Sequence, residues 1–260
     1  MRDEGDRLHQ GLRDAFAELL GQIDGARLEE RSGYRLVVCP AVPFPGFNGL
    51  WAEGPDQLAS LHDLEGAIEE VEGAGVSCWV ELRAGWTPAI EQAVRRLGLT
   101  DQDSMPGMVV RPAELVVGPA PELEVATVRD AAGLATAGDL AAAGFGVPPE
   151  LLAALYAPRV AALETVSIYV ACARGAPVST ATTWTADGGV GVFNVATPPE
   201  HRGHGYGRAI TTKAVEDAFK AGADLAWLQS SPLGESVYRA MGFRQVETYV
   251  ILGRPSSGQS

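Results

Sequence analysis

A glycine-rich turn that opens a helix is the part of the sequence best equipped for chemistry. It lies in the stretch NVATPPEHRGHGYGRA, from Asn194 to Ala209. The glycines alternate along the turn, at Gly203, Gly205 and Gly207. Without a Cβ at these positions, backbone N–H groups can close around an anion, and the helix N-terminus adds its positive dipole end. Arg202 and Arg208 add charge, so the pattern predicts a pyrophosphate site.

The spacing separates this turn from two better-known phosphate loops. A P-loop requires a Gly-Lys-Ser/Thr sequence, which does not follow here. The dinucleotide-binding fingerprint requires G-x-G-x-x-G in a first strand-to-helix turn, whereas this turn has G-x-G-x-G and follows several predicted strands. A turn that binds no ligand is the remaining alternative.

Two motifs in this half of the chain resemble those of the GNAT acyltransferase superfamily. The segment RGHGYG, Arg202–Gly207, resembles its acyl-CoA pyrophosphate loop, of the form Gln/Arg-x-x-Gly-x-Gly/Ala. The segment LQSSPLGESVYRAMGF, Leu228–Phe243, resembles its later strand and tyrosine-bearing helix, followed by a Gly-Phe that starts the last strand. The resemblance covers roughly residues 122–254. It implies an α+β fold with a mixed, mostly antiparallel sheet flanked by helices and a splayed central strand.

The first half of the chain resembles the same fold more weakly. Its segment WVELRAG and the following LGL and SMPGMVV look like the last strand-helix-strand of the family. No glycine loop stands at the corresponding stretch Trp51–Gln57, which reads WAEGPDQ. We therefore expect a tandem GNAT protein whose degenerate N-terminal copy has lost its acyl-CoA site.

The resemblance implies an acyl-CoA-dependent N-acyltransferase that moves the acetyl group of acetyl-CoA directly to a primary amine, without a metal. The N–H of Val195 would face the thioester carbonyl and stabilise the developing oxyanion, and that of Thr197 would face the pantetheine amide. An ordinary strand role is the alternative for Val195. The expected acyl-CoA contacts are Val195, Ala196, Thr197, Arg202, Gly203, His204, Gly205, Tyr206, Gly207 and Arg208.

Tyr238 is the predicted general acid. The CoA thiolate needs a proton as it departs, and a phenol with a pKa near ~10 can supply one in a dry site. Simple packing of the ring, or a hydrogen bond to the sulfur, is the alternative role.

The sequence offers several candidates for the general base and for the residues of the acceptor pocket. The strand before the loop has no carboxylate, and other groups near strand ends are Glu164, Asp187, Glu200 and His201. Asn194 is a candidate for orienting the substrate or a water, and a water relay to the strand backbone and Ser230 is a further possibility for the base. The predicted acceptor-side residues are Asn194, Trp184 and Phe145. The missing carboxylate leaves a non-catalytic acyl-CoA-binding regulatory module as the alternative function.

Hydrophobic periodicity and turn residues predict the elements that carry these groups. The expected helices span Leu8–Ile23, Leu64–Glu72, Pro88–Leu97, Ala131–Ala143, Pro149–Leu163, Gly205–Ala221 and Gly234–Met241. The expected strands span Tyr34–Cys39, Asn48–Glu53, Val76–Leu82, Met105–Val110, Glu124–Val128, Val166–Ala173, Val178–Trp184, Val190–Thr197, Leu225–Ser230 and Gln245–Leu252. Gly188-Gly189 suits the turn between two of the strands.

A proline-rich connector, Gly118–Leu123, divides the predicted domains. We expect a degenerate GNAT-like domain at 1–117, a linker at 118–123, a catalytic GNAT domain at 124–254 and a tail at 255–260. The two halves are expected to pack as a pseudo-dimer inside one monomer, with a homodimer as the alternative.

The composition and charge of the chain limit the classes of partner that we expect it to bind. The chain has 260 residues, 46% of them hydrophobic, and a formal charge of −13 with only two lysines, Lys213 and Lys220. A basic face for nucleic acid or an anionic membrane is therefore not expected, and a small-molecule or peptide amine is the predicted partner. The polar start of the chain favours the cytoplasm. Cys39, Cys78 and Cys172 form no C-x-x-C pair, so no metal site is predicted.

Overall fold

The computed structural model describes residues 3–52, 60–119 and 121–255 of the chain. The chain divides into two compact units. We call residues 16–106 and 247–260 the N unit, and residues 1–15 and 107–246 the C unit. Each unit is therefore discontinuous in sequence, unlike the contiguous ranges 1–117 and 124–254 predicted above.

The described helices and strands lie close to the predicted ranges. The α-helices are α1 Glu4–Leu20, α2 Leu61–Gly73, α3 Pro88–Arg96, α4 Ala131–Phe145, α5 Pro158–Ala161, α6 Tyr206–Lys220 and α7 Glu235–Ala240. Short 3₁₀ turns are η1 Pro112–Glu114, η2 Pro149–Leu151, η3 Ala153–Tyr156 and η4 Pro199–His201. The strands are β1 Arg27–Arg31, β2 Tyr34–Val38, β3 Asn48–Ala52, β4 Trp79–Arg83, β5 Asp101–Val110, β6 Glu124–Val128, β7 Val166–Ala173, β8 Ala176–Ala186, β9 Gly189–Ala196, β10 Leu225–Gln229 and β11 Arg244–Gly253.

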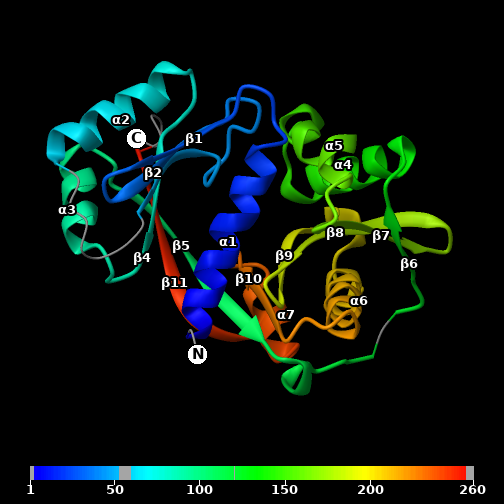
Figure 1. Ribbon diagram of the computed structural model, residues 1–260. Helices are drawn as coiled ribbons and strands as arrows, with labels where there is room; N and C mark the ends of the chain where they lie inside the picture. Colours follow the sequence, from blue (N-terminus) through cyan, green and yellow to red (C-terminus); the bar gives the residue numbers. More distant parts are fainter. Residues whose placement is uncertain (1–2, 53–59, 120, 256–260) are drawn as a thin grey trace. The chain divides into compact units, whose positions relative to one another are not determined.

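The C unit is built on strands in the order β5-β10-β9-β8-β7-β6. Neighbouring strands are antiparallel except β9 and β10, which are parallel and joined through α6. Helices α4 and α6 cover opposite faces of β7, β8 and β9 (Figure 1). Between the strands and α6 lies an apolar core that includes Val190, Val192, Val215, Ala226 and Leu228. This arrangement is the mixed, helix-flanked sheet that the sequence predicts.

The N unit repeats the pattern with fewer strands, in the order β1-β2-β3-β4-β11. Here β3 and β4 form the parallel pair, and α2 lies between them in the chain. Helices α2 and α3 pack through Leu64, Ile68, Ile90 and Val94 against the buried side chains of the strands. Each unit thus has antiparallel strands that lead into one parallel pair.

The closing strand of each unit comes from the other half of the chain. Residues 107–110 of β5 pair antiparallel with β10 in the C unit, although β5 is encoded in the first half. Residues 249–253 of β11 pair antiparallel with β4 in the N unit, although β11 ends the second half. This exchange of closing strands is why the units are discontinuous.

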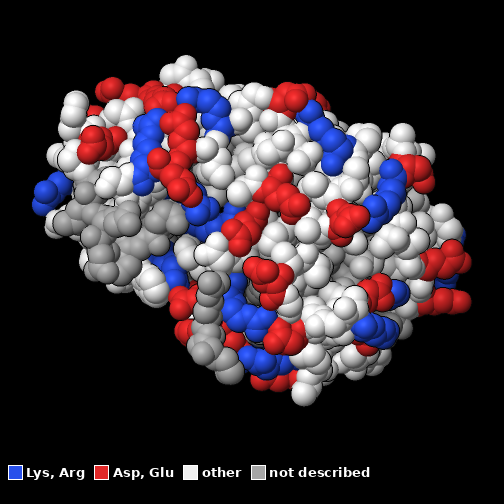
Figure 2. All heavy atoms as spheres, viewed as in Figure 1, with Lys and Arg blue, Asp and Glu red and all other residues white. Residues whose placement is uncertain are grey.

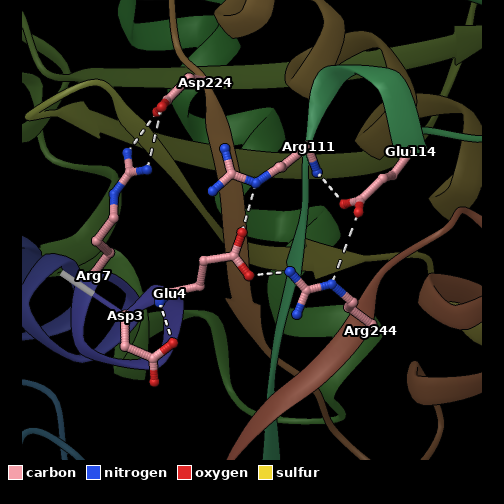
Figure 3. Close-up of polar contacts among 7 residues, drawn as sticks. All are labelled: Asp3, Glu4, Arg7, Arg111, Glu114, Asp224 and Arg244. Atoms are coloured by element: carbon pink, nitrogen blue, oxygen red, sulfur yellow. Dashed lines mark hydrogen bonds and ion pairs between the residues drawn. The ribbon is translucent and has the colours of Figure 1, made fainter. Parts of the chain in front are cut away.

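The first turns of α1 complete the C unit (Figure 3). The carboxylate of Glu4 accepts a hydrogen bond from Arg111 Nε at 2.6 Å and another from Arg244. One turn later, Arg7 pairs with Asp224 at 2.5 Å. The ion pairs hold the pKa of Glu4 and of Asp224 below the usual range of a carboxyl, although burial opposes the shift at both sites. The start of the chain is thereby fixed beside the beginnings of β10 and β11.

Three sequence predictions differ from the structure. Strand β1 was not predicted because its sequence RLEER is charged; it is an edge strand whose arginines pair with Glu70 of α2. The predicted helix Pro149–Leu163 is η2, η3 and α5, because Pro158 cannot continue a helix and Ala157 before it is extended, with ψ 148°. The β8–β9 turn is Asp187-Gly188, flanked by the pair Ala186 and Gly189.

Acidic and basic side chains are interleaved on the face of the molecule drawn in Figure 2. Within the described part of the chain, no helix combines the length and apolar character that crossing a bilayer requires. Most of the stretch Trp51–Gln57, and the tail beyond Pro255, lie outside the described residues.

Candidate acyl-donor site

The two parallel strands of the C unit separate along their length. Leu225 pairs with Gly189, Ala226 with Val190 and Trp227 with Gly191, and the pairing ends there. Strand β9 nevertheless continues to Ala196 and β10 to Gln229. The last residues of both strands therefore extend beyond the paired segment. This is the splayed central strand that the sequence predicts.

A β-bulge breaks the other edge of β9 at the same level. Thr180 of β8 is opposite Ala196, and Thr182 is opposite Phe193, so two residues of β9 face one residue of β8. One of the two is Asn194, which has a φ of 50°. Asparagine is one of the few residues with a side chain that tolerates this left-handed conformation. The bulge takes Val195, the second residue, out of the regular ladder.

The end of β9 is held by its neighbours. The hydroxyl of Ser179 donates to the carbonyl of Ala196 at 2.8 Å and lies 3.0 Å from the hydroxyl of Thr197. Gly144 of α4 lies against the same segment, because a Cβ there would be 2.8 Å from that of Ala196. These contacts fix the backbone where the sequence predicts the pantetheine arm.

The glycine turn has the conformation of an anion cradle. Gly203 and Gly205 have φ values of 80° and 79°, which side-chain-bearing residues rarely adopt. Gly205 is the N-cap of α6 and offers no side chain to cap it. The helix begins with the bond from Ala209 N–H to the Gly205 carbonyl, at 3.0 Å. The N–H groups of the first turn have no intrahelical partner, so they are free to bind an anion.

The charged side chains of the cradle make local contacts. Arg202 donates to the carbonyl of Thr197 at 3.1 Å and to that of Gly144 at 2.7 Å, which ties the loop to β9 and α4. The Arg208 guanidinium donates to the Val116 carbonyl at 3.3 Å. Both arginines still border the cavity described below. Their first role is therefore to shape the cradle.

A cavity of about 440 Å³ opens between the end of β9, the cradle and α7. Its lining includes most predicted acyl-donor residues, namely Val195, Ala196, Thr197, Arg202, Gly203, Gly205, Tyr206, Gly207 and Arg208. Tyr238 and Phe145 also line it. The structure thus brings one predicted acceptor residue and the predicted acid to the same cavity as the cradle.

Three predicted residues are not among the lining residues. His204 stacks on Tyr206, with ring centroids 5.3 Å apart, and its Nδ1 lies 2.9 Å from the Arg202 carbonyl. Asn194 occupies the bulge. Trp184 is buried and lines a separate cavity of about 230 Å³ with Trp227 and residues of α1. Sequence spacing alone does not show that these side chains turn away.

Tyr238 lies on α7 with its ring above Gly234, where a Cβ would be 2.8 Å from the ring. Its ring is tilted against Phe243, with centroids 5.8 Å apart. Burial raises the pKa of Tyr238 to about 12. The phenol is therefore protonated at neutral pH, as a proton donor must be.

The candidate general bases differ in whether they lie at the cavity. His201 borders the cavity beside the cradle, whereas Glu164, Asp187 and Glu200 do not. Asp187 lies in the β8–β9 turn, at the opposite end of β9 from Val195. Ser230 is buried and donates to the carbonyl of Ser231 at 2.8 Å. Among the described lining residues there is no Asp or Glu.

Sequence reasoning missed an apolar rim of the cavity. Leu233 is 81% exposed and Val237 is 37% exposed, and both line it. The sequence contains a sign of this rim, because Leu233 is an apolar residue inside the turn sequence Ser-Pro-Leu-Gly, where an exposed side chain is expected. Among the described residues no cluster of His, Cys, Asp and Glu could hold a metal ion.

Comparisons with known proteins agree with this geometry. A family model for the acetyltransferase (GNAT) domain matches residues 164–245. A GCN5-related N-acetyltransferase from Kribbella flavida is 24% identical, over 95% of this chain and 96% of its own, with a TM-score of 0.71. One from Sphaerobacter thermophilus is 16% identical, over 97% and 93%, with a TM-score of 0.63. A tandem GNAT protein from the clavulanic acid biosynthesis pathway is 14% identical, over 92% and 86%, with a TM-score of 0.61. No curated protein sequence matches the chain.

At these identities the solved structures show the fold, and the family model adds the domain. The matched range begins two residues before β7 and ends within β11, so it includes the splayed strand, the cradle and Tyr238. It lies entirely in the C unit. The chain therefore has the GNAT fold, and its residues 164–245 match the acetyltransferase (GNAT) domain.

Proposed function

We propose that the chain transfers the acetyl group of acetyl-CoA to a primary amine by direct attack. The observation that carries this proposal is the junction of two open backbone surfaces in one cavity. The end of β9, beyond its pairing with β10, and the uncapped N-terminus of α6 both border the cavity near Tyr238. Acetyl-CoA needs both surfaces, one for its pantetheine amides and one for its pyrophosphate.

The donor would bind along these surfaces. The N–H groups of Gly205 to Arg208 and the helix dipole would hold the pyrophosphate. The N–H of Thr197 would bind a pantetheine amide, and that of Val195 would bind the thioester carbonyl. Leu233 and Val237 would cover the apolar part of the arm, which suits their exposure at the rim.

The chemistry would proceed through a tetrahedral adduct. The amine nitrogen forms a bond to the carbonyl carbon, and the resulting oxyanion is stabilised by the Val195 N–H. When the C–S bond breaks, Tyr238 donates its proton to the thiolate. The proton of the attacking amine passes to water, because no carboxylate lines the cavity among the described residues, and water returns a proton to the Tyr238 phenolate, so that amine and acetyl-CoA give the amide and free CoA.

The enzyme is better supported than a non-catalytic acyl-CoA-binding module. The family match is to an acetyltransferase domain, and Tyr238 is at the cavity. The tandem arrangement with a degenerate N unit, a small-molecule or peptide amine as acceptor, and a cytoplasmic monomer or homodimer complete the proposal.

An acetyl-CoA turnover screen tests it. The full chain would be incubated with acetyl-CoA and a panel of amines, amino acids, aminoglycosides and peptides, and free thiol would be followed. We expect thiol release that depends on at least one amine and is lost in a Gly205→Glu variant. Tight binding of acetyl-CoA without turnover across the panel would favour the non-catalytic module instead.

A further inference from the structure

Two aromatic rings, those of Trp227 and Phe193, form a wedge that closes the gap between β9 and β10 at its inner end, where the pairing of the two strands stops. The last pair before the strands separate is Gly191 and Trp227. A Cβ on Gly191 would lie 2.4 Å from the Trp227 ring, so the indole covers this glycine directly. Phe193 stands edge-on to the same indole, with centroids 5.4 Å apart and ring planes at 90°. The wedge therefore fills the inner end on the face away from α6.

Glycines on several sides keep the indole in place. A Cβ on Gly11 of α1 would lie 2.6 Å from the Trp227 ring, and one on Gly189 would lie 3.3 Å from its nitrogen. Trp227 is 2% exposed. These contacts hold the indole on the sides of Gly11, Gly189 and Gly191, and its remaining edge borders the cavity of about 230 Å³ described above. Phe193 therefore rests on a ring that is held on three sides.

The other face of the gap is filled as well. Val192 and Leu228 are 4% and 1% exposed, and they belong to the apolar core beneath α6. The cavity of the site reaches Val195 and Tyr238, and its lining includes none of the wedge or core residues just named. Space inside the gap thus ends close to Val195.

The direction of the acyl group follows from the shape of the donor. The pyrophosphate cradle lies at the open end of the gap, so the pantetheine arm enters from there. In a linear thioester the acyl group lies beyond the sulfur, and it must point toward the closed end. Phe193 is two residues before Val195, which corresponds to at most about 7 Å of backbone, because the bulged residue Asn194 lies between them. That length accommodates two or three carbons in front of the ring.

We propose that Phe193, supported by Trp227, sets the length of the acyl group and restricts the donor to acetyl-CoA and propionyl-CoA. This inference rests on the proposed acyl transfer and names the residue that selects its donor. Phe193 is a specificity determinant here, because the acyl chain would end against its ring.

The test compares acyl-CoAs of increasing length in the full chain. For the native protein we expect kcat/KM to fall about 10–200-fold for the first methylene that no longer fits, between propionyl- and butyryl-CoA. In Phe193→Ala, the ratio of kcat/KM for hexanoyl-CoA to that for acetyl-CoA should rise at least tenfold. Phe219→Ala is the matched control, because it removes another half-buried ring, at the far end of α6, and should leave the ratio unchanged.

The outcomes are distinct from those that test the proposed function. Equal use of hexanoyl- and acetyl-CoA by the native protein would overturn the length limit while confirming acyl transfer. If no acyl-CoA is turned over, the proposed acyl transfer is wrong, and the length limit is then tested by the affinity of the native protein for each acyl-CoA. In that case equal Kd values for acetyl- and hexanoyl-CoA would overturn it. If Phe193→Ala does not fold, Phe193→Leu replaces it and should relax the limit by one or two carbons.

Discussion

The two units place a helix after the first strand of a parallel pair, and the two helices begin in opposite ways. In the C unit, α6 starts at Gly205, which has a left-handed backbone and no capping side chain. In the N unit, α2 starts at Ser60 with a complete capping box. The Asp63 N–H donates to the Ser60 hydroxyl at 3.1 Å, and the Asp63 carboxylate accepts from the Ser60 N–H at 3.3 Å.

This difference teaches that a shared topology does not preserve a shared site. In α2 the side chains satisfy N–H groups that α6 leaves open, and a carboxylate stands at the positive end of the helix dipole. Hydrogen bonds from Ser60 hold the pKa of Asp63 below its usual value, so the carboxylate stays charged near neutral pH. A pyrophosphate would meet a negative charge there. The predictions below test this comparison.

The largest expected effect concerns the bulge of β9. Asn194→Val places a β-branched residue where φ is 50°, so the bulge should straighten and the Val195 N–H should leave its position. Losing an oxyanion donor typically lowers kcat about 10²–10³-fold. Asn194→Gly keeps the backbone freedom and should retain most activity. Equal losses in both variants would show that the Asn194 side chain matters rather than the backbone conformation.

Next comes the cradle itself. Gly205→Glu combines a strained left-handed residue with a negative charge at the helix N-terminus, and acetyl-CoA affinity should fall about 100-fold. Gly175→Glu is the control, since Gly175 also has a positive φ, 77°, but lies in the β7–β8 turn. Calorimetric titration of both variants measures the difference. Similar affinities in the two variants would mean that the cradle binds no pyrophosphate.

Tyr238→Phe should mainly affect turnover. We expect kcat to fall about 10²-fold, the lower end for a general acid because a thiolate is a tolerable leaving group, with an unchanged Kd for acetyl-CoA. Because the pKa of Tyr238 is about 12, the native phenol keeps its proton up to about pH 10. The ratio of native to variant kcat should therefore stay constant from pH 7 to pH 10 and shrink only as pH approaches 12. Weaker binding with an intact kcat would make Tyr238 a packing residue.

The smallest effect lies in the N unit. Ser60→Ala removes the N-cap of α2 and should lower the free energy of unfolding by about 1 kcal/mol, without changing acetyl-CoA binding. The stabilising hydrogen bonds to Asp63 require its carboxylate, whose pKa is lowered in the folded state. The difference between native and variant protein should therefore persist above about pH 4 and diminish below it. Denaturant unfolding at pH 7 and pH 3 measures both values. A loss of acetyl-CoA binding would contradict the assignment of α2 to a purely structural role.

Local signals in the sequence predicted the glycine turn and the helix that follows it. Gly203 and Gly205 have left-handed backbone conformations that residues with side chains rarely adopt, and the glycines that favour this conformation are visible in the sequence itself. The apolar stripe of α1 is likewise buried at Leu8, Leu12 and Leu20, as its spacing indicates. Alternating apolar residues located most strands for the same reason.

Non-local features could not be predicted. Whether 107–110 pairs with β10 or with a strand of its own half depends on contacts far apart in the sequence. The left-handed Asn194 is set by the register between β8 and β9, which single-strand patterns do not contain. His204 turns onto Tyr206 through a ring contact that no spacing rule gives.

The stoichiometry of acetyl-CoA binding tests the central claim most directly. Calorimetric titration of the full chain should give one acetyl-CoA per chain, bound in the C unit at the uncapped start of α6. The same titration of Gly205→Glu should show an affinity about 100-fold weaker than that of the native protein. Two acetyl-CoA molecules per native chain, or one molecule retained at native affinity by Gly205→Glu, would contradict the assignment of a single donor site to the C unit.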